Sequence, residues 1–236
     1  MILKKSDMAE QENSASEFDR LSADAMEILL DEAQDEGMFE EALRLNSGNP
    51  GILRLLCGHP ASPPRVRDEA ARVLGLTAEK APYLPGGKSE QTEEAKRENL
   101  AQKIRALTAG EKIRISVKAG REARSLLIKD SNKQVVLGVI ANPRITVSEV
   151  EMAARTRSLP EEALREIAKN KEWVKNYSVI YNLVSNSKTP PGVTVGFLPW
   201  IKSKDLNLIA RNKDIPDAVR TAARRFSEVR AKKRQA

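Results

Sequence analysis

Apolar residues recur along this chain in short groups at helical spacing, each followed by an asparagine or a residue that takes its place. A polar cap, and often a proline, then opens the next group. The phrase occurs at residues 55–59, 139–142, 167–170, 183–186 and 209–212. Such recurrence predicts a stack of short helices, each of which buries its apolar face only against its neighbours. No segment alternates as a strand would, so the pattern predicts an all-α fold.

Capping signals place the helix boundaries. A hydroxyl residue followed three positions later by an acid or amide predicts a capping box, and four such pairs occur: Thr108 with Glu111, Ser131 with Gln134, Thr146 with Glu149, and Ser158 with Glu161. Asparagine tolerates the left-handed conformation that ends a helix, so helices should end at Asn142, Asn170, Asn186 and Asn212. The helices predicted after residue 105 are 109–119, 121–130, 132–141, 147–155, 160–169, 172–185, 191–198, 204–211 and 216–230.

Composition shifts divide the chain into segments. Polar residues without periodicity predict a flexible lead-in at the start, and prolines with a double glycine predict a linker. The predicted organisation is a lead-in at 1–20, an acidic helical segment with one repeat-like unit at 21–76, a linker at 77–98, a basic helical repeat domain at 99–230 and a basic tail at 231–236.

The two end units align without gaps, with residues 64–74 over residues 216–226. Their shared phrase of Val-Arg, an Ala-Ala pair and an apolar residue resembles the inner helix of HEAT-like repeats. The short Asn/His-Pro and Thr-Pro-Pro turns resemble those of the leucine-rich repeat variant. The resemblance implies an irregular right-handed α-solenoid that acts as an adaptor or scaffold. It also implies an enzymatic alternative, because the HEAT-like alkylpurine DNA glycosylases bind DNA on a basic concave face.

The net charge of +7 conceals a division along the chain. Residues 1–50 hold 4 Lys/Arg against 13 Asp/Glu, a net charge of −9, so the remainder holds 36 against 20, a net charge of +16. This division predicts either an acidic arm that competes for a basic surface or two partners of opposite charge.

Residue counts narrow the possible chemistry. One cysteine excludes an internal disulfide and any cage of several thiolates. The only histidine, His59, stands beside Cys57 where the other phrases carry asparagine, so we interpret it as a turn residue rather than a metal ligand or catalytic base. No phosphate-binding glycine loop is present. We therefore expect no cofactor, no metal and no small-molecule substrate. Asp205 near Trp200 is the nearest match to a base-excision acid.

Cellular location is suggested by the same features. The first residues turn acidic before an apolar run of signal-peptide length can form, and no stretch approaches the roughly 18 apolar residues of a membrane span. A single cysteine suits a reducing compartment. We expect a soluble cytoplasmic protein that does not bind membranes.

Two groups of residues are candidates for partner binding. The first is aromatic, with Trp173, Tyr177 and Tyr181 at i, i+4 and i+8 on one predicted helix face and Trp200 shortly after. The second is basic and comprises Arg114, Lys118, Arg121, Arg124, Arg220, Arg224 and Arg225.

These groups predict a non-catalytic scaffold that binds a protein with an acidic or extended segment through the surface of residues 100–230. Sequence-nonspecific nucleic-acid binding by the basic face is the alternative. A HEAT-like base-excision enzyme is the third hypothesis.

Overall fold

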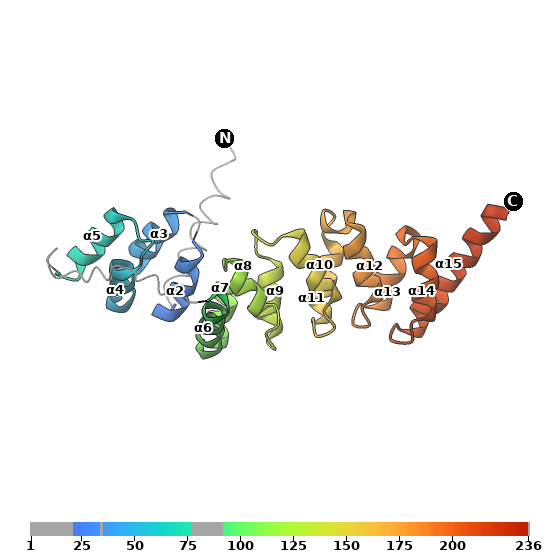
Figure 1. Cartoon of the computed structure of the whole chain (residues 1–236), viewed down its shortest axis with the longest axis horizontal. Helices are drawn as coiled ribbons and strands as arrows, with labels where there is room; N and C mark the ends of the chain where they lie inside the picture. The colour runs from blue at the N-terminus through green and yellow to red at the C-terminus, as the bar shows by residue number, and fades with distance from the viewer. Residues whose placement is uncertain (1–20, 34, 77–91, 236) are drawn as a thin grey trace, which may run out of the picture. The chain divides into compact units, whose positions relative to one another are not determined.

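The computed structural model describes residues 21–33, 35–76 and 92–235. Within these ranges all regular structure is helical, with fourteen α-helices and two short 3₁₀ helices (Figure 1). The all-α prediction is therefore confirmed for the described chain. The chain divides into two compact units, residues 1–126 (unit 1) and residues 127–236 (unit 2). The predicted lead-in at 1–20 and most of the predicted linker lie outside the described residues.

Unit 1 is built around the acidic helix α2. Its helices are α2 (Ala23–Asp31), α3 (Gly37–Leu45), α4 (Pro50–Gly58), α5 (Pro64–Val73), α6 (Glu93–Ala106), α7 (Ala109–Ser116) and α8 (Arg121–Leu127), which ends at the division between the units. Helix α2 packs against α3, α4, α6 and α7, and α4 pairs with α5 as the repeat-like phrase predicts. Met26, Ile28 and Leu30 of α2 are fully buried, which makes this helix the centre of the core.

Helix α6 corrects the end of the predicted linker. Residues 93–98 belong to this helix, and the Thr92 side chain caps it by accepting a hydrogen bond from the Ala95 N–H. Its first two turns carry no apolar stripe, so periodicity could not reveal a helix there. The run of Glu, Ala, Lys and Arg nevertheless favours the helical backbone.

Acidic side chains of the N-terminal segment form hydrogen bonds and an ion pair with other helices of unit 1. The Glu32 carboxylate, just after α2, accepts hydrogen bonds from the backbone N–H groups of Glu122 (3.1 Å) and Ala123 (2.9 Å) at the start of α8. Glu27 forms an ion pair with Lys103 of α6 at 2.9 Å. A carboxylate at a helix N-terminus is favoured by the helix dipole. These acids therefore hold helices of unit 1 together.

Unit 2 consists of helices that follow one another in chain order (Figure 1). They are α9 (Lys133–Ile140), α10 (Val147–Arg155), α11 (Glu161–Lys169), η1 (Trp173–Lys175), α12 (Tyr177–Ser185), α13 (Pro191–Phe197), η2 (Leu198–Trp200), α14 (Ser203–Arg211) and α15 (Asp217–Gln235). Alternate helices pack together, α9 against α11 and α10 against α12, and α14 pairs with α15. One continuous aliphatic core runs from α9 to α15. Helix α15 continues through the residues predicted to form a basic tail.

A five-residue turn recurs between helices and explains the repeated phrase. It begins at His59, Asn142, Thr156, Asn186 and Asn212. In each turn the N–H of the fourth residue donates to the carbonyl of the first, with N···O distances of 3.0 to 3.3 Å. The fourth residue is turned inward, and four of the five are buried: Ser62, Leu159, Thr189 and Ile215. A proline or a capping threonine then starts the next helix.

The asparagines end their helices by a different mechanism from the predicted one. No non-glycine residue has a positive φ in the described chain, and Asn170, Asn186 and Asn212 have extended backbones with ψ between 108° and 120°. The side-chain oxygen instead accepts a hydrogen bond from the N–H two residues later. His59 does the same through Nδ1, which accepts from the Ala61 N–H at 3.2 Å. Its interpretation as a substitute for asparagine is confirmed.

Two of the four predicted capping boxes are confirmed, those of Thr108 with Glu111 and Thr146 with Glu149. Helix α9 is capped by Asn132, one residue after the predicted Ser131, because the Asn132 oxygen accepts from the Gln134 N–H at 2.9 Å. Helix α11 follows Pro160, which offers no side-chain cap, so the box predicted from Ser158 is wrong. Sequence spacing alone does not show which of two adjacent polar residues adopts the cap conformation.

We predict an acid-dependent loss of stability through Glu111. Its carboxylate accepts hydrogen bonds from Thr108 N–H (2.9 Å), Thr108 Oγ1 (2.7 Å) and the Ser22 N–H (3.0 Å). Partial burial raises the pKa of this carboxyl, but the hydrogen bonds from Ser22 and Thr108 outweigh burial and lower the pKa to about 2. Because the folded pKa lies below the unfolded value, the contribution of Glu111 is present above about pH 4.5 and is lost toward pH 2.

The variant Glu111→Gln should lower the free energy of unfolding by about 1 kcal/mol at pH 7, allowing for solvent screening. It should also reduce the fall in stability between about pH 4.5 and pH 2. Denaturant unfolding followed by far-UV circular dichroism across this range measures both effects. Glu149→Gln removes a carboxylate from the other confirmed capping box and is the matched control. Parallel pH profiles for wild type and Glu111→Gln would contradict the prediction.

Candidate binding surface

The predicted aromatic helix is interrupted in the structure. Trp173 lies in the short helix η1, while Tyr177 begins α12. Asn176 separates the two helices because its side-chain oxygen caps α12 by accepting from the Ser178 N–H at 2.8 Å. The prediction of a single helix over 172–185 is therefore wrong, and Trp173 does not share a continuous helix face with Tyr177 and Tyr181.

Tyr177 joins the start of α12 to the start of α14. Its hydroxyl donates to Asp205 Oδ2 at 2.5 Å and accepts a hydrogen bond from the Lys202 N–H at 3.1 Å. The Lys202 ammonium lies 4.5 Å from the Tyr177 ring centroid, within the range of a cation–π contact. Burial raises the pKa of the Tyr177 hydroxyl, and Asp205 raises it further, although the bond from Lys202 N–H opposes this. The hydroxyl is therefore held as a protonated donor.

Four aromatic side chains belong to this part of unit 2. The rings of Tyr177 and Tyr181 stack with centroids 6.4 Å apart, and Trp200 lies 5.7 Å from Phe197. Trp200 is 60% exposed, which is rare for tryptophan. Because the Lys202 N–H binds the Tyr177 hydroxyl, the segment that carries Trp200 runs beside the tyrosines. We call Tyr177, Tyr181, Trp200 and Lys202 the aromatic surface.

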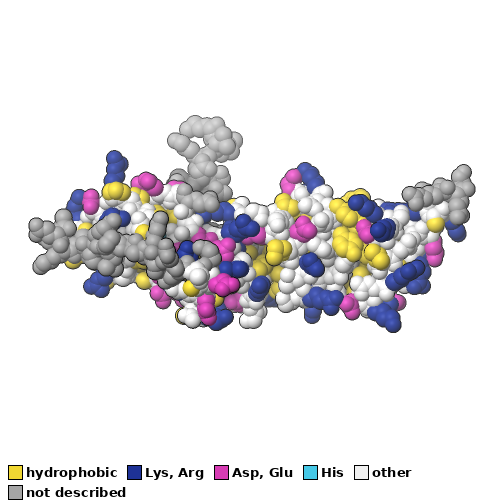
Figure 2. Space-filling view, in the orientation of Figure 1, with side chains coloured by type: hydrophobic (Ala, Val, Ile, Leu, Met, Phe, Trp, Pro, Cys, Tyr) yellow, Lys and Arg dark blue, Asp and Glu magenta, His cyan; other side chains and the backbone are white. Residues whose placement is uncertain are grey.

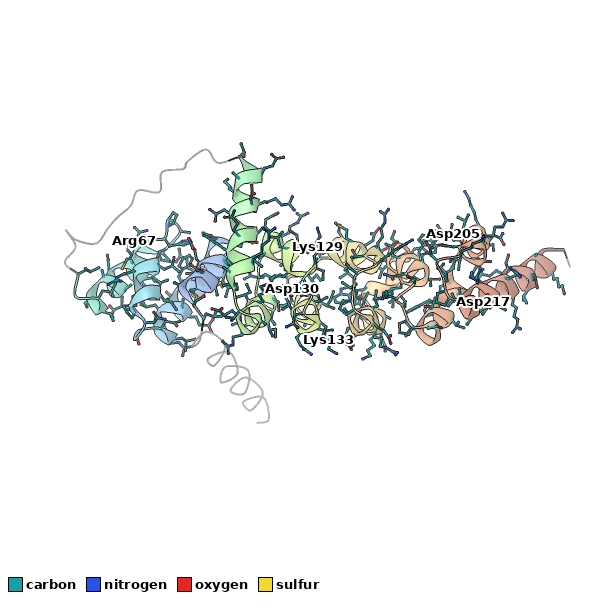
Figure 3. The ribbon with its side chains drawn as sticks, turned by 90° about the horizontal axis from the view of Figure 1, so that it is seen from below. Arg67, Lys129, Asp130, Lys133, Asp205 and Asp217 are labelled. Carbon is teal, nitrogen blue, oxygen red and sulfur yellow. The ribbon has the colours of Figure 1, made fainter. Side chains whose placement is uncertain are left out.

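Figures 2 and 3 show the side chains around these helices. Figure 2 shows hydrophobic side chains gathered over the region of α12 to α14, with Lys and Arg side chains beside them. Asp205 lies at the start of α14, while Asp217 lies at the start of α15 (Figure 3). Lys202 and Lys204, which follow Trp200 in the chain, are both exposed.

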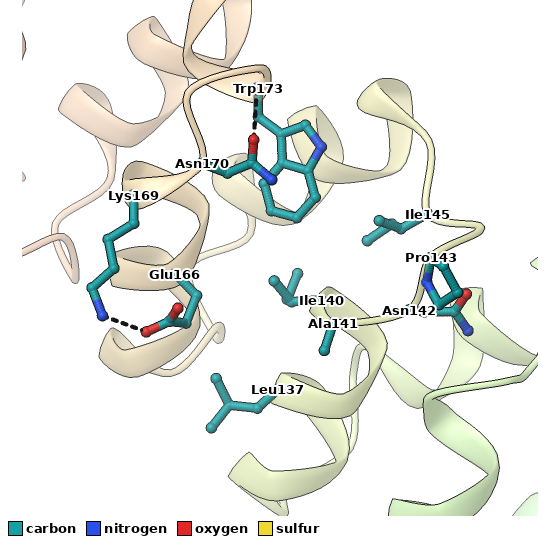
Figure 4. Close-up of a pocket in the computed structure, with 10 residues that line it drawn as sticks. All are labelled: Leu137, Ile140, Ala141, Asn142, Pro143, Ile145, Glu166, Lys169, Asn170 and Trp173. Atoms are coloured by element: carbon teal, nitrogen blue, oxygen red, sulfur yellow. Dashed lines mark hydrogen bonds and ion pairs between the residues drawn. The ribbon is translucent and has the colours of Figure 1, made fainter. Parts of the chain in front are cut away.

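A groove of about 540 Å³ lies at Trp173, four positions before Tyr177 in the chain. One wall is the turn between α9 and α10, and the other is the turn from α11 into η1 (Figure 4). Its lining residues are Leu137, Ile140, Ala141, Asn142, Pro143, Ile145, Glu166, Lys169, Asn170 and Trp173. We call it the Trp173 groove. Its volume falls within the range of binding sites for small ligands or side chains.

The first basic group lies in unit 1 and does not form one helix face. Helix α7 ends at Ser116 and α8 begins at Arg121, so no helix continues through Gly120. Arg124 is only 4% exposed, and its guanidinium donates to the Ala119 carbonyl. Arg114 and Lys118 are half-buried, whereas Arg121 is exposed. Arg124 is therefore a structural residue and not part of an open cationic surface.

The second basic group lies on α15. Arg220 is half-buried and pairs with Asp217 at 2.9 Å, while Arg224 and Arg225 are exposed. Arg230, also basic, donates to the carbonyl oxygens of Ile201 and Pro199. One of the basic side chains of α15 thus donates hydrogen bonds to backbone carbonyl groups in and just after η2.

Some of the surface cations of unit 2 form ion pairs with nearby acids. Residues 127–236 hold 21 Lys/Arg against 11 Asp/Glu, a net charge of +10. The ion pairs are Lys133–Glu162, Arg157–Asp214, Arg165–Glu161, Lys169–Glu166, Lys175–Glu172 and Arg220–Asp217. Exposed pairs contribute little to stability, but they reduce the local positive potential. The basic character of unit 2 is therefore dispersed.

Cys57 and His59 have structural surroundings. His59 Nε2 lies 3.1 Å from Asp31 Oδ1, and its ring lies against Phe39. Burial raises the pKa of the Cys57 thiol, although Arg67 opposes this, so the thiolate that a nucleophile needs is disfavoured. Among the described residues, no group of three His, Cys, Asp or Glu side chains could hold a metal ion.

Asp205 is engaged by Tyr177 and is not among the residues that line the three described pockets. Tyr177 and Asp205 were both candidates from the sequence, but their contact could not be predicted, because they lie 28 positions apart. The Trp173 groove was also missed, since its two walls belong to different turns. The sequence marked Asn142, Asn170 and Trp173 separately, but no pattern joined them across the two turns.

Comparisons with protein families, curated proteins and solved structures found no match to this chain. In the described part of the chain, no helix has both the length and the apolar character needed to cross a membrane.

Proposed function

We propose that this protein is a non-catalytic scaffold that binds a partner protein through the aromatic surface of unit 2. The observation that carries the proposal is the stacked pair of Tyr177 and Tyr181, joined through the Tyr177 hydroxyl to the segment that carries exposed Trp200 and Lys202. Tyrosine and tryptophan dominate the binding energy of protein interfaces because they bury large areas at low entropic cost. An acidic or extended segment of the partner suits the exposed cations Lys202 and Lys204.

An α-solenoid is the architecture that we propose for this scaffold, in the manner of HEAT-like repeats. Two observations support it: alternate helices of unit 2 pack together, and the same five-residue turn recurs between them. Stacked repeats of this kind provide extended surfaces for partners. The engagement of Asp205 by Tyr177 favours this role over base excision, which needs an acid in a pocket that accepts an extruded base.

Sequence-nonspecific nucleic-acid binding is the second candidate function. It is favoured by exposed cations such as Lys188, Lys204 and Lys213, which have no ion-pair partner within the described residues. The ion pairs elsewhere in unit 2 count against it, because they compensate the charge that phosphate contacts require.

The variant Trp200→Ala tests the proposed function. Because Trp200 is exposed, we expect the fold to remain and the affinity for any captured partner protein to fall by about tenfold or more. Met152→Ala is the matched control, since Met152 is 70% exposed on α10 and lies outside the aromatic surface. Binding is measured with the purified partner. Equal affinities of wild type and Trp200→Ala would contradict the proposal. Binding of duplex DNA that weakens steeply between about 50 and 200 mM salt would favour the second candidate.

A further inference from the structure

We propose that the Trp173 groove holds an apolar side chain of an extended acidic segment of the partner. This inference rests on the proposed function and specifies the partner's chemistry. Three observations support it: apolar side chains on both walls of the groove, an amide donor on one wall, and exposed cations next in sequence to lining residues of each wall.

Aliphatic side chains line one wall of the groove, and the Trp173 indole lies with Glu166, Lys169 and Asn170 on the other. Leu137, Ile140, Pro143 and Ile145 face the gap across from Trp173 (Figure 4). At about 540 Å³ the space suits one or two apolar side chains. Burying a leucine-sized side chain there would strengthen binding by about tenfold or more.

Asn170 supplies a directed hydrogen-bond donor. Its Oδ1 accepts from the N–H groups of Glu172 (3.0 Å) and Trp173 (3.3 Å), which fixes the orientation of the carboxamide. The Nδ2 group is therefore left on the opposite side, and it has no acceptor within the described residues. Since Asn170 lines the groove, a main-chain carbonyl of an extended peptide is a suitable acceptor.

Exposed cations that neighbour the lining residues in sequence favour an acidic segment. Arg144 stands between two lining residues of one wall, and Lys171 follows Asn170 on the other. Both are exposed and have no acidic partner in the described chain. Nearby acids are already engaged, because Glu166 pairs with Lys169 and Glu172 pairs with Lys175. Carboxylates that flank the bound apolar side chain would therefore meet two free cations.

The first experiment uses Trp173 as its own reporter. Trp173 and Trp200 are the two tryptophans of the chain, so Trp200→Phe leaves Trp173 as the source of indole fluorescence. The probe is the peptide acetyl-Glu-Glu-Leu-Leu-Glu-Glu-amide. We expect it to change the Trp173 emission in a saturable manner. The same peptide with serine in place of both leucines should bind about tenfold more weakly or worse.

Protein variants separate the donor from the charges. Asn170→Asp keeps an oxygen for the Glu172 and Trp173 N–H groups but loses Nδ2, so binding should weaken about fivefold or more. This loss should persist with the uncharged peptide acetyl-Gln-Gln-Leu-Leu-Gln-Gln-amide, which excludes charge repulsion as its cause. Arg144→Gln and Lys171→Gln should each weaken the acidic peptide about threefold. The matched control is Lys213→Gln, an exposed lysine away from the groove, which should change nothing.

The inference is overturned if the acidic peptide leaves Trp173 emission unchanged up to about 10 mM, a limit beyond which binding is too weak to be specific. Equal responses to the leucine and serine peptides would also overturn it, as would a preference for a single-stranded oligonucleotide. If the acidic peptide does not bind in these assays while Trp200→Ala still weakens binding of the partner protein, the proposed function stands and the groove inference falls. If the peptide binds and Trp200→Ala keeps the partner, the proposed role of the aromatic surface falls instead.

Discussion

Replacing Gly120 by alanine should lower the free energy of unfolding of unit 1 by about 3 kcal/mol. A Cβ at this position would lie 2.0 Å from Glu32 Oε2 and 2.4 Å from Glu32 Cβ, so the Glu32 side chain and its backbone must move. Movement would break the two hydrogen bonds that Glu32 accepts from the start of α8. The loss therefore combines overpacking with the removal of a helix cap.

Gly110→Ala is the matched control for this prediction. Gly110 lies in α7, and no atom comes within 4 Å of a Cβ built there. Gly110 is the second residue of this helix, so alanine there should be neutral or stabilise by less than about 0.5 kcal/mol. Denaturant unfolding followed by far-UV circular dichroism measures both variants. Adding Glu32→Ala should relieve part of the Gly120→Ala loss, because the clashing group is then absent. Similar unfolding energies for Gly120→Ala and Gly110→Ala would show that the contact with Glu32 is wrong.

Asn186→Asp should cost unit 2 about 2 to 4 kcal/mol at pH 7. The Asn186 amide nitrogen donates to the carbonyl oxygens of Ala154 (2.8 Å) and Thr156 (3.1 Å), while its oxygen accepts from the Lys188 N–H at 3.0 Å. Aspartate keeps the acceptor but places an anionic oxygen against two carbonyl oxygens. The site is only 4% exposed, so water cannot compensate.

The penalty should depend on pH in a defined direction. A protonated carboxyl can donate to one carbonyl, so the folded state raises the pKa of the introduced group above its unfolded value of about 3.9. The variant should therefore approach wild-type stability below about pH 4 and lose stability as the pH rises. Asn212→Asp is the control, because Asn212 uses only its oxygen, toward the Asp214 N–H, and should cost less than about 1 kcal/mol. Equal costs at the two positions would refute the role of the Asn186 donor.

Short-range chemistry was predictable from the sequence. The helix predicted over 147–155 has these bounds in the structure. Thr146 and Glu149 cap its first turn, and its apolar residues recur at helical spacing up to its end. The turn phrase was located correctly, yet its mechanism was not. A left-handed backbone and a side-chain hydrogen bond both place asparagine at the same position, so residue type could not distinguish them.

Contacts between distant residues could not be predicted. Glu32 reaches α8 across about 90 positions, and Tyr177 reaches Asp205 across 28. Neither pairing leaves a periodic signal, because each depends on how helices pack after they form. Arg124 shows the same limit: its charge suggested an exposed surface, whereas packing buries it against the Ala119 carbonyl. The Trp173 groove likewise arises only when two turns come together.

The placement of the tryptophans makes the two units separately observable during unfolding. Trp173 and Trp200 both belong to unit 2, whereas helices of both units contribute to far-UV circular dichroism. Coincident denaturation curves from the two signals would mean that the chain unfolds as one cooperative system. Separate curves would mean that each unit has its own stability, and that one can melt while the other still presents its surface.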